Sequence, residues 1–418
     1  MANLTKLNIN QTQRQTADSI IGPPARGKNF YGRTDFVRQM WQRLERGSNL
    51  LLAAPRRFGK SSVMLNLLDV PRDGYKIVRV DVQGYTTAAD LIAELVQQMA
   101  QDSYFAGLLA QVKTLPANIF SKLQQNIEEF EVEGFKLKLR ETLQRGWQDM
   151  ARELFQVLER ADQRIVVMLD ELPMMVDQMA KAGKHDEARL LLQFLRSLRQ
   201  APELSNVRFI IAGSIGIGRV LNVLGEIRSI NDLEQLTLGP FPPSVAEGLL
   251  DELALSQEIA LTPESRAQML AEIEIYVPFF LQVLFAETVN EHRQSETPIA
   301  PELVAQAYRE RVLGVYCLHY FEDYYQRLER YFDPQTAAAA KRILRQIAQD
   351  GPLEAAVCFH FYSELLGGEA RDENFIELMQ DLQHDGYLRY DAETGRYQFA
   401  LKVLRDLWQR HYAQPLKK

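Results

Sequence analysis

The fold of this chain is decided by residues 49–62, which read NLLLAAPRRFGKSS. The first residues of this stretch are mostly apolar and predict a short buried strand, and the residues after Lys60 predict a helix. Between the two, Gly59, Lys60 and Ser61 match the end of the pattern GxxxxGK[ST], in which a glycine-rich loop joins a strand to a helix. Ala54 stands where that pattern has its first glycine. The order of strand, loop and helix predicts a phosphate-binding loop.

A phosphate suits such a loop because backbone amides can converge on its oxygens and the following helix adds the positive end of its dipole. Lys60 is expected to bind the outer phosphates, and the hydroxyl of Ser61 is expected to ligate Mg²⁺. Alanine at position 54 is a mild replacement, but it is disfavoured if that position needs a positive φ. We predict binding of ATP with Mg²⁺ through a run of nine residues: Ala54, Pro55, Arg56, Arg57, Phe58, Gly59, Lys60, Ser61 and Ser62.

A second apolar strand ends in two carboxylates, because residues 165–171 read IVVMLDE. Asp170 and Glu171 should therefore lie at the carboxyl edge of the sheet, where the phosphate loop also lies. We expect Asp170 to hold Mg²⁺ through water and Glu171 to orient and polarise the attacking water, so that Glu171 and the phosphate-binding Lys60 are the expected catalytic residues. The alternative is a solvated acidic turn, but the coexistence of this strand end with the phosphate loop favours nucleotide binding.

A third apolar strand, residues 207–212, leads into Gly213 and Ser214. The hydroxyl of Ser214 could contact the terminal phosphate and the attacking water, which would make it a catalytic residue. It could equally be an ordinary turn residue.

Strands alternate with helices as far as Leu238, which predicts an α/β fold with a parallel sheet and helices on both faces. After Leu238 the pattern becomes helical. It ends in three helical segments and a two-stranded hairpin, which is the order of a winged helix-turn-helix. We expect five segments: an N-terminal arm or strap (1–29), an ATPase core (30–240), a helical lid (241–300), a helical connector (301–335) and a winged helix-turn-helix (336–418).

The net charge, the Cys and His content and the apolar runs of the chain disfavour several classes of protein. The formal net charge is −7, whereas proteins that depend on bulk attraction to nucleic acid or anionic lipid are more often basic. The 2 cysteines and 6 histidines show no spacing typical of a zinc site. The N-terminus lacks the apolar stretch of a signal peptide, and no apolar run approaches the roughly 18 residues that span a bilayer. We expect a cytoplasmic protein without a membrane span.

Five stretches of the chain carry a family resemblance: Phe30-Tyr31-Gly32-Arg33, residues 55–61, Asp170-Glu171-Leu172-Pro173, Ala212-Gly213-Ser214 and Val277-Pro278-Phe279-Phe280-Leu281-Gln282. Together they resemble the STAND and archaeal-type ATPases of the AAA+ group, whose P-loop fold belongs to the ASCE class. The resemblance covers residues 28–412, since the tail also looks like that family's winged helix. Two positions depart from the family's glycines, Ala54 in the phosphate loop and Tyr276 in the lid motif.

The resemblance implies an ATP-driven switch. Residues 30–33 are expected to lie near the adenine and ribose, and the lid is expected to close over the nucleotide with Pro278 facing the base. Arg57 would reach a phosphate or a neighbouring subunit, unless it is a solvated loop arginine. Arg219 and Arg228 are candidates for an arginine finger supplied in trans.

Three functions stay open at this point. The first is an ATPase switch that regulates a protein partner or self-association, in signalling or defence. The second is a DNA-bound ATPase, origin- or transposition-associated, that uses the winged helix. The third is a non-catalytic nucleotide-binding scaffold, against which Lys60, Asp170 and Glu171 together argue. Residues 331–418 hold 11 Lys and Arg against 13 Asp and Glu, and the expected recognition helix, residues 372–385, holds no Lys or Arg, so we favour protein contacts over DNA.

Overall fold

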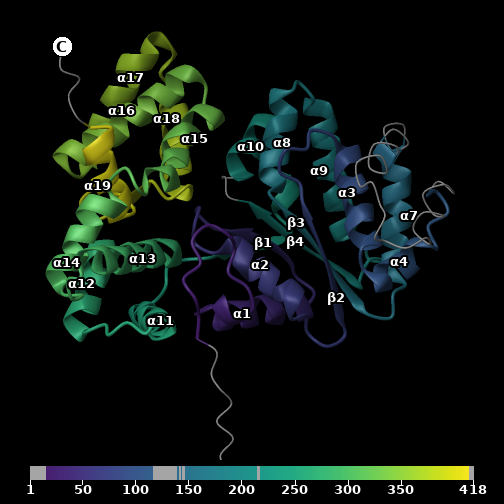
Figure 1. Ribbon diagram of the computed structural model, residues 1–418. Coiled ribbons are helices and arrows are strands. Elements are labelled where there is room, and N and C mark those ends of the chain that lie inside the picture. The colour runs from purple at the N-terminus through teal and green to yellow at the C-terminus, as the bar shows by residue number, and fades with distance from the viewer. Residues whose placement is uncertain (1–15, 116–138, 141–142, 144–145, 214–216, 414–418) are drawn as a thin grey trace, which may run out of the picture.

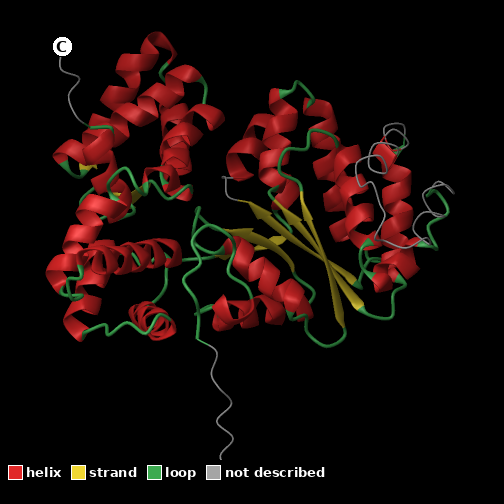
Figure 2. Ribbon diagram, viewed as in Figure 1, coloured by secondary structure: helices red, strands yellow, loops and turns green. Residues whose placement is uncertain are grey.

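The computed structural model describes residues 16–115, 139–140, 143, 146–213 and 217–413. Its centre is a five-stranded sheet of order β2-β3-β4-β1-β5, in which every neighbouring pair is parallel (Figure 1 and Figure 2). The strands are β1 (Asn49–Ala53), β2 (Tyr75–Asp81), β3 (Arg164–Asp170), β4 (Val207–Gly213) and β5 (Leu233–Thr237). Because β1 lies between β4 and β5, the loop after β1 emerges where the strand order reverses, which is where open α/β sheets bind their ligands.

Two hydrophobic cores cover the two faces of the sheet. Val166 and Met168 of β3 face one core, and Ile165 and Val167 face the other, as the alternation of a strand requires. The first core contains α1 (Thr34–Glu45) and α2 (Lys60–Asp69). The second contains α3 (Ala88–Ala100), α4 (Ser103–Leu109), α7 (Trp147–Glu159), α8 (Leu172–Lys181), α9 (His185–Gln200) and α10 (Ile217–Leu224). Figure 1 shows the two helix layers on opposite sides of the strands.

Three helices follow the sheet in the segment that the sequence predicts as a lid, and we keep that name for them: α11 (Pro243–Ser256), α12 (Pro263–Ile273) and α13 (Pro278–Ser295). Each has a proline in its first turn, where the missing N–H has no intrahelical partner to lose. The apolar side chains of the lid belong to the same core as those of α1 and α2. The lid is therefore packed on one face of the sheet only.

The remaining residues form a helical unit with a small antiparallel sheet of order β6-β8-β7. Its helices are α14 (Pro301–Ala307), η4 (Tyr308–Val312), η5 (Leu318–Tyr320), α15 (Glu322–Tyr331), α16 (Pro334–Asp350), α17 (Ala355–Leu366), η6 (Gly367–Glu369), α18 (Asp372–His384) and α19 (Lys402–His411). Its strands are β6 (Leu353–Glu354), β7 (Leu388–Asp391) and β8 (Arg396–Phe399). This unit continues the core that α1, α2 and the lid share.

The structure confirms the α/β fold with a parallel sheet and adds elements that the sequence pattern does not predict. β5 is an edge strand in which only Leu236 is buried, so it has no apolar run. α8 follows the apolar strand after a single residue, Glu171, whose side chain makes no capping hydrogen bond. β6 is only two residues long. Within the described ranges, we find no helix that is long and apolar enough to cross a membrane.

Candidate functional site

The phosphate loop lies between the end of β1 and the start of α2. Two of its residues have a positive φ, Gly59 at +97° and Arg57 at +72°. Gly59 precedes the first turn of α2, and it adopts the left-handed conformation there without the strain that a side chain would cause. Ala54 is buried and is not among the residues with positive φ, so the alanine at this position carries no such strain.

Lys60, Asp170 and Glu171 lie together at the carboxyl edge of the sheet. The Nζ of Lys60 donates hydrogen bonds to Oδ1 of Asp170 and, at 2.9 Å, to Oε1 of Glu171. The Lys60 side chain is 8% exposed and that of Asp170 is 2% exposed. The second oxygen of Asp170, Oδ2, accepts a hydrogen bond from Nη2 of Arg79 at 2.6 Å. The two motifs of the sequence therefore meet at one point, together with an arginine that neither motif contains.

The charges of this group hold one another ionised against the effect of burial. Burial alone would lower the pKa of Lys60, but Asp170 and Glu171 outweigh it and raise that pKa above its usual value. Burial alone would raise the pKa of Asp170, but Lys60 and Arg79 outweigh it and hold the pKa of that carboxyl below its usual range. Lys60 and Asp170 are therefore both charged at neutral pH.

The backbone at Glu171 is strained. Its φ is +59°, in the left-handed region that residues with a side chain adopt rarely. This conformation turns the chain from β3 straight into α8, and the Glu171 side chain makes no capping hydrogen bond to that helix. Its carboxylate instead meets Lys60. Backbone strain of this kind concentrates at functional sites.

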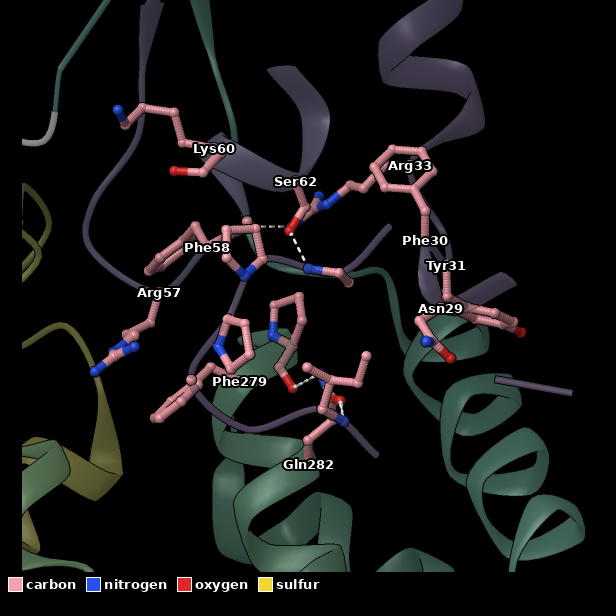
Figure 3. A pocket seen from close by; sticks show the side chains of 18 of the residues that line it. Asn29, Phe30, Tyr31, Arg33, Arg57, Phe58, Lys60, Ser62, Phe279 and Gln282 are labelled. Carbon is pink, nitrogen blue, oxygen red and sulfur yellow. Dashed lines mark hydrogen bonds between the residues drawn. The ribbon is translucent and has the colours of Figure 1, made fainter. Parts of the chain in front are cut away.

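A cavity of about 260 Å³ lies beside the phosphate loop. Four parts of the chain line it: the phosphate loop with Glu171, the N-terminal segment before α1, Phe241 with Leu249 of α11, and the start of α13. Figure 3 shows Lys60 and Arg57 toward one end and Asn29 and Tyr31 toward the other. The residues expected near the base and ribose that line the cavity are Phe30, Tyr31, Arg33 and Pro278. A cavity that is charged at one end and aromatic at the other fits a nucleotide.

Arg33 lines this cavity, but its guanidinium is bound by the protein. It donates hydrogen bonds to the carbonyl oxygens of Phe58 at 3.1 Å and Gly239 at 2.7 Å. It also lies 4.4 Å from the ring centre of Phe241, and burial lowers the pKa of Arg33 to about 10. Arg33 therefore joins the phosphate loop to the residues that lead into the lid. Gly32 is not among the residues that line the cavity, and it packs closely against the lid, since a Cβ there would lie 2.4 Å from Cγ1 of Val245 on α11.

Residues 16–29 run along the cavity, and we call them the strap. The amide of Ala25 donates a hydrogen bond to Oγ of Ser62 at 2.9 Å, and the amide of Ile20 donates one to Oε1 of Gln282 on α13 at 2.9 Å (Figure 3). The guanidinium of Arg26 also donates hydrogen bonds to the carboxylate of Asp69 on α2. The strap is therefore fastened both to the core and to the lid. Ser62, expected among the nucleotide-binding residues, uses its hydroxyl for this contact.

The phosphate loop also contacts the lid and α15. Nη1 of Arg56 lies 2.8 Å from Oδ2 of Asp323, and the carbonyl oxygen of Arg56 accepts a hydrogen bond from Oη of Tyr324 at 3.2 Å. The guanidinium of Arg57 lies 4.3 Å from the ring centre of Phe279, at the start of α13. Arg57 is therefore packed against the lid rather than fully solvated, and its expected contact with a phosphate or a neighbouring subunit stays a prediction. The loop that would hold phosphate touches both units that follow the sheet.

Arg219 is bound within its own chain. It donates a hydrogen bond to the carbonyl oxygen of Tyr331, and its Nε lies 3.4 Å from Oδ2 of Asp381 on α18. These contacts argue against Arg219 as a finger offered to a neighbouring subunit. Arg228 is exposed and stays a candidate for that role. Ser214 lies outside the described residues, so its expected catalytic role stays a prediction.

Ser61 and Asp170 are a fitting donor set for Mg²⁺. In nucleotide sites Mg²⁺ takes one or two protein oxygens and completes its coordination with phosphate and water. Ser61 lines the cavity, and Asp170 is an ionised carboxylate beside Glu171, which also lines it. Both oxygens of Asp170 are bound by cations of the protein, so its use for a metal requires that Lys60 move to another partner.

Comparison with known proteins bears on the fold. No family model and no curated protein matches the chain. Among solved structures, the chain is similar to the Walker-type ATPase Paby2304 of Pyrococcus abyssi, with a TM-score of 0.63 and 16% sequence identity over 93% of this chain and 99% of that chain. The chain has the fold of a P-loop ATPase.

Two further solved structures are similar with lower TM-scores. The ORC2 protein of Aeropyrum pernix has a TM-score of 0.40 and 12% identity over 93% of this chain and 96% of that chain. The RuvB Holliday junction branch migration motor of Thermotoga maritima has a TM-score of 0.41 and 11% identity over 89% of this chain and 94% of that chain. The similarities are therefore of fold and leave the activity to be argued from the site.

Proposed function

We propose that this chain binds ATP with Mg²⁺ and hydrolyses it. The observation that supports this most directly is the meeting of Lys60, Asp170 and Glu171 beside a cavity that the phosphate loop lines. A lysine held by two carboxylates is poised to exchange them for an anionic phosphate, because the ammonium then gains a partner of higher charge. The aromatic end of the cavity, with Tyr31 and Pro278, would receive the base.

Each residue then has a role. Lys60 binds the outer phosphate oxygens, helped by the loop amides and the N-terminus of α2. Glu171, released from Lys60, orients the attacking water and accepts its proton. Ser61 and Asp170 would hold Mg²⁺, which supplies positive charge to the phosphate oxygens.

The test is equilibrium binding of a fluorescent ATP analogue with Mg²⁺ to Lys60→Ala. Affinity should fall by about 30-fold or more, which corresponds to the roughly 2 kcal/mol or more that the loss of one partner of a buried charge pair costs. Lys113→Ala is the matched control, because Lys113 is an exposed lysine of the same core. Unchanged affinity in a folded Lys60→Ala protein would overturn the site and the function.

A finer proposal is that the nucleotide state changes how the C-terminal helices pack on the core. It is supported by the contacts of Arg56 with α15 and of Arg57 with α13, because a ligand biases only elements that meet its site differently in two states. A winged helix built from α16, α17, α18 and the β7–β8 hairpin would then be hidden in one state and offered to a protein partner or a second copy in the other.

Hydrogen exchange with ADP and with a non-hydrolysable ATP analogue tests the switch. We expect protection to change in the lid and in residues 301–413 as well as around the phosphate loop. Changes confined to residues 30–240 would leave a simple ATPase without a switch.

The charge of α18 favours a protein partner over DNA. The helix has no Lys or Arg, and its exposed residues include Asp372, Glu373 and Glu377, which would repel phosphates. If the chain binds duplex DNA, we expect that binding to survive the charge-neutral changes Asn374→Ala and Gln380→Ala on the exposed side of α18. Loss of DNA binding in these variants would favour the DNA-bound alternative.

A further inference from the structure

Arg79 is a cation of the site that neither the phosphate-loop motif nor the Asp170-Glu171 motif predicts. It lies on β2, which pairs with β3 so that Asp81 stands opposite Asp170. Its Nη2 donates a hydrogen bond to Oδ2 of Asp170 at 2.6 Å and lies 3.3 Å from Oδ2 of Asp81. The Asp170 side chain is 2% exposed and that of Asp81 is 47% exposed. The guanidinium therefore bridges a buried carboxylate of the site to a carboxylate at the solvent edge.

Asp170 depends on Arg79 most at the moment when Lys60 is engaged elsewhere. In this structure Lys60 holds one oxygen of Asp170 and Arg79 holds the other. When Lys60 turns to a phosphate, Arg79 is the protein cation that still fixes the direction of the buried carboxylate. A carboxylate that has lost both partners would be free to rotate and would present its oxygens poorly to a metal-bound water.

Arginine suits this position better than lysine. Its planar guanidinium presents several N–H donors in fixed directions, so it can set the orientation of a carboxylate, whereas a lysine supplies mainly charge. The second anchor is itself fixed, because Oδ1 of Asp81 accepts a hydrogen bond from the amide of Gln83 at 3.1 Å. Arg79 is thereby tied through Asp81 to the backbone at the end of β2.

We propose that Arg79 is a positioning residue that holds Asp170 in place for Mg²⁺ while Lys60 binds phosphate. The inference rests on the proposed binding of ATP with Mg²⁺ and adds to it a residue for the metal. Asp170 would then keep one fixed partner, because Lys60 moves to the phosphate and Arg79 stays in place. Arg79 is absent from the described residues that line the cavity, so it acts on the nucleotide only through Asp170 and the metal.

The experiment is a titration of Mg²⁺ against binding of a fluorescent ATP analogue, starting from EDTA. In Arg79→Met the Mg²⁺ concentration that gives half of the metal-dependent gain in affinity should rise by about tenfold or more, the size expected for an outer partner of a metal ligand. Affinity in EDTA should stay within about twofold of the wild type, because Arg79 does not touch the nucleotide. Arg164→Met is the matched control, since Arg164 lies on β3 at the opposite end of the sheet. It should leave the Mg²⁺ midpoint unchanged.

Arg79→Lys keeps the positive charge but loses the planar guanidinium with its fixed N–H donors. It should raise the Mg²⁺ midpoint by less than Arg79→Met does. This variant carries the test if Arg79→Met does not fold. An unchanged or lowered Mg²⁺ midpoint in the folded variant would overturn the proposal. A loss of affinity for the analogue that is as large in EDTA as in Mg²⁺ would also overturn it, because it would mean direct contact of Arg79 with the nucleotide. If the wild type itself binds no ATP analogue with or without Mg²⁺, the proposed function fails. If the wild type binds the ATP analogue and Arg79→Met has the same Mg²⁺ midpoint, the proposed function stands and only the role of Arg79 fails.

Discussion

Two groups of charged side chains in the interior differ in how closely their oppositely charged atoms approach one another. The loop cluster consists of Lys60, Arg79, Asp170 and Glu171, and the interface cluster consists of Arg219, Arg327, Asp381 and Asp385. In the loop cluster, Arg79 meets Asp170 at 2.6 Å and Lys60 meets Glu171 at 2.9 Å. In the interface cluster the atoms are 3.4 Å apart between Arg219 and Asp381 and 3.7 Å apart between Arg327 and Asp385. In the described part of the chain, Oδ2 of Asp381 and Oδ1 of Asp385 find no hydrogen-bond donor.

The pKa values of the acids follow this difference. The cations of the loop cluster outweigh burial and hold the pKa of Asp170 below its usual range. In the interface cluster burial prevails, because it raises the pKa of Asp381 to about 7 against the opposing effect of Arg219, and it raises the pKa of Asp385 against that of Arg327. Buried charges stabilise a structure only where their partners meet them with good hydrogen bonds. The loop cluster meets that condition and the interface cluster does not.

The interface cluster lies where the ATPase core meets the C-terminal helices. Arg219 belongs to α10 of the core, Arg327 to α15, Asp381 to α18, and Asp385 follows α18 directly. The contact between the core and α18 is therefore built on charges that fit poorly. Under the proposed switch, separating these charges would cost less than separating a well-paired cluster.

The largest effect should come from the loop cluster, through Glu171→Gln. Glutamine keeps the size of the side chain but cannot accept the proton of the attacking water. We expect ATP hydrolysis, measured as phosphate release, to slow by about 10²–10⁴-fold while binding of the ATP analogue stays within about threefold. Glu203→Gln, at an exposed position of the core, should keep the wild-type rate. A wild-type rate in Glu171→Gln would show that Glu171 is not the base.

The next effect should come from the interface cluster, through Asp381→Asn. The pKa of about 7 lies above the unfolded value, so the folded state binds this proton more tightly and the free energy of unfolding falls as the pH rises from about 4 to about 7. The groups that face Asp381 are Arg219, Glu377 and Asp385. Asparagine removes the buried charge, and it should therefore add about 1 kcal/mol or more to the free energy of unfolding at about pH 8 and clearly less at about pH 5, where only part of the loss has occurred.

Urea unfolding of Asp381→Asn at the two pH values measures this difference. Asp73→Asn is the control, because Asp73 is exposed in a turn of the core and its replacement should change both values equally. A loss of stability at both pH values would mean that the attraction of Arg219 outweighs the burial of the charge, and the contrast between the two clusters would disappear.

The smallest effect should come from the link between the phosphate loop and α15. Tyr324→Phe removes the hydrogen bond from Oη to the carbonyl oxygen of Arg56, so the free energy of unfolding should fall by about 0.5–1.5 kcal/mol. Amide exchange in α15 should become faster in the same variant. Tyr316→Phe, at a position that is 62% exposed, should change neither quantity. Equal exchange in wild type and Tyr324→Phe would show that this contact does not hold α15 against the loop.

The parts of the site that the sequence predicts are those set by local pattern. A strand, a loop ending in Gly59-Lys60-Ser61 and a helix follow one another within residues 49–68, so the phosphate loop could be predicted from that stretch alone. The meeting of Lys60 with Asp170 and Glu171 could also be predicted, because parallel strands end at one edge of a sheet.

The parts that the sequence does not predict depend on partners far apart in the chain. Arg79 is a lone charge inside a strand, and only the register of β2 against β3 brings it to Asp170. The residues around position 33 match a family motif, but the partner of Arg33 at Gly239 is 206 residues away, so its part in holding the lid does not follow from the motif. The contacts of Arg219 with α18 likewise arise from tertiary packing, and they argue against its expected role in trans.

The strap has a consequence for timing. Its amides close two hydrogen bonds, one to the side chain of Ser62 and one to the side chain of Gln282 on α13. Under the proposed function, the strap and the lid would both border the bound nucleotide, and loosening of either would open its way out. Departure of ADP would then wait on a rare opening rather than on the chemical step, as happens in enzymes whose slowest event is product release. The residence time of the spent nucleotide, set by a short stretch of backbone, would decide how long each cycle lasts.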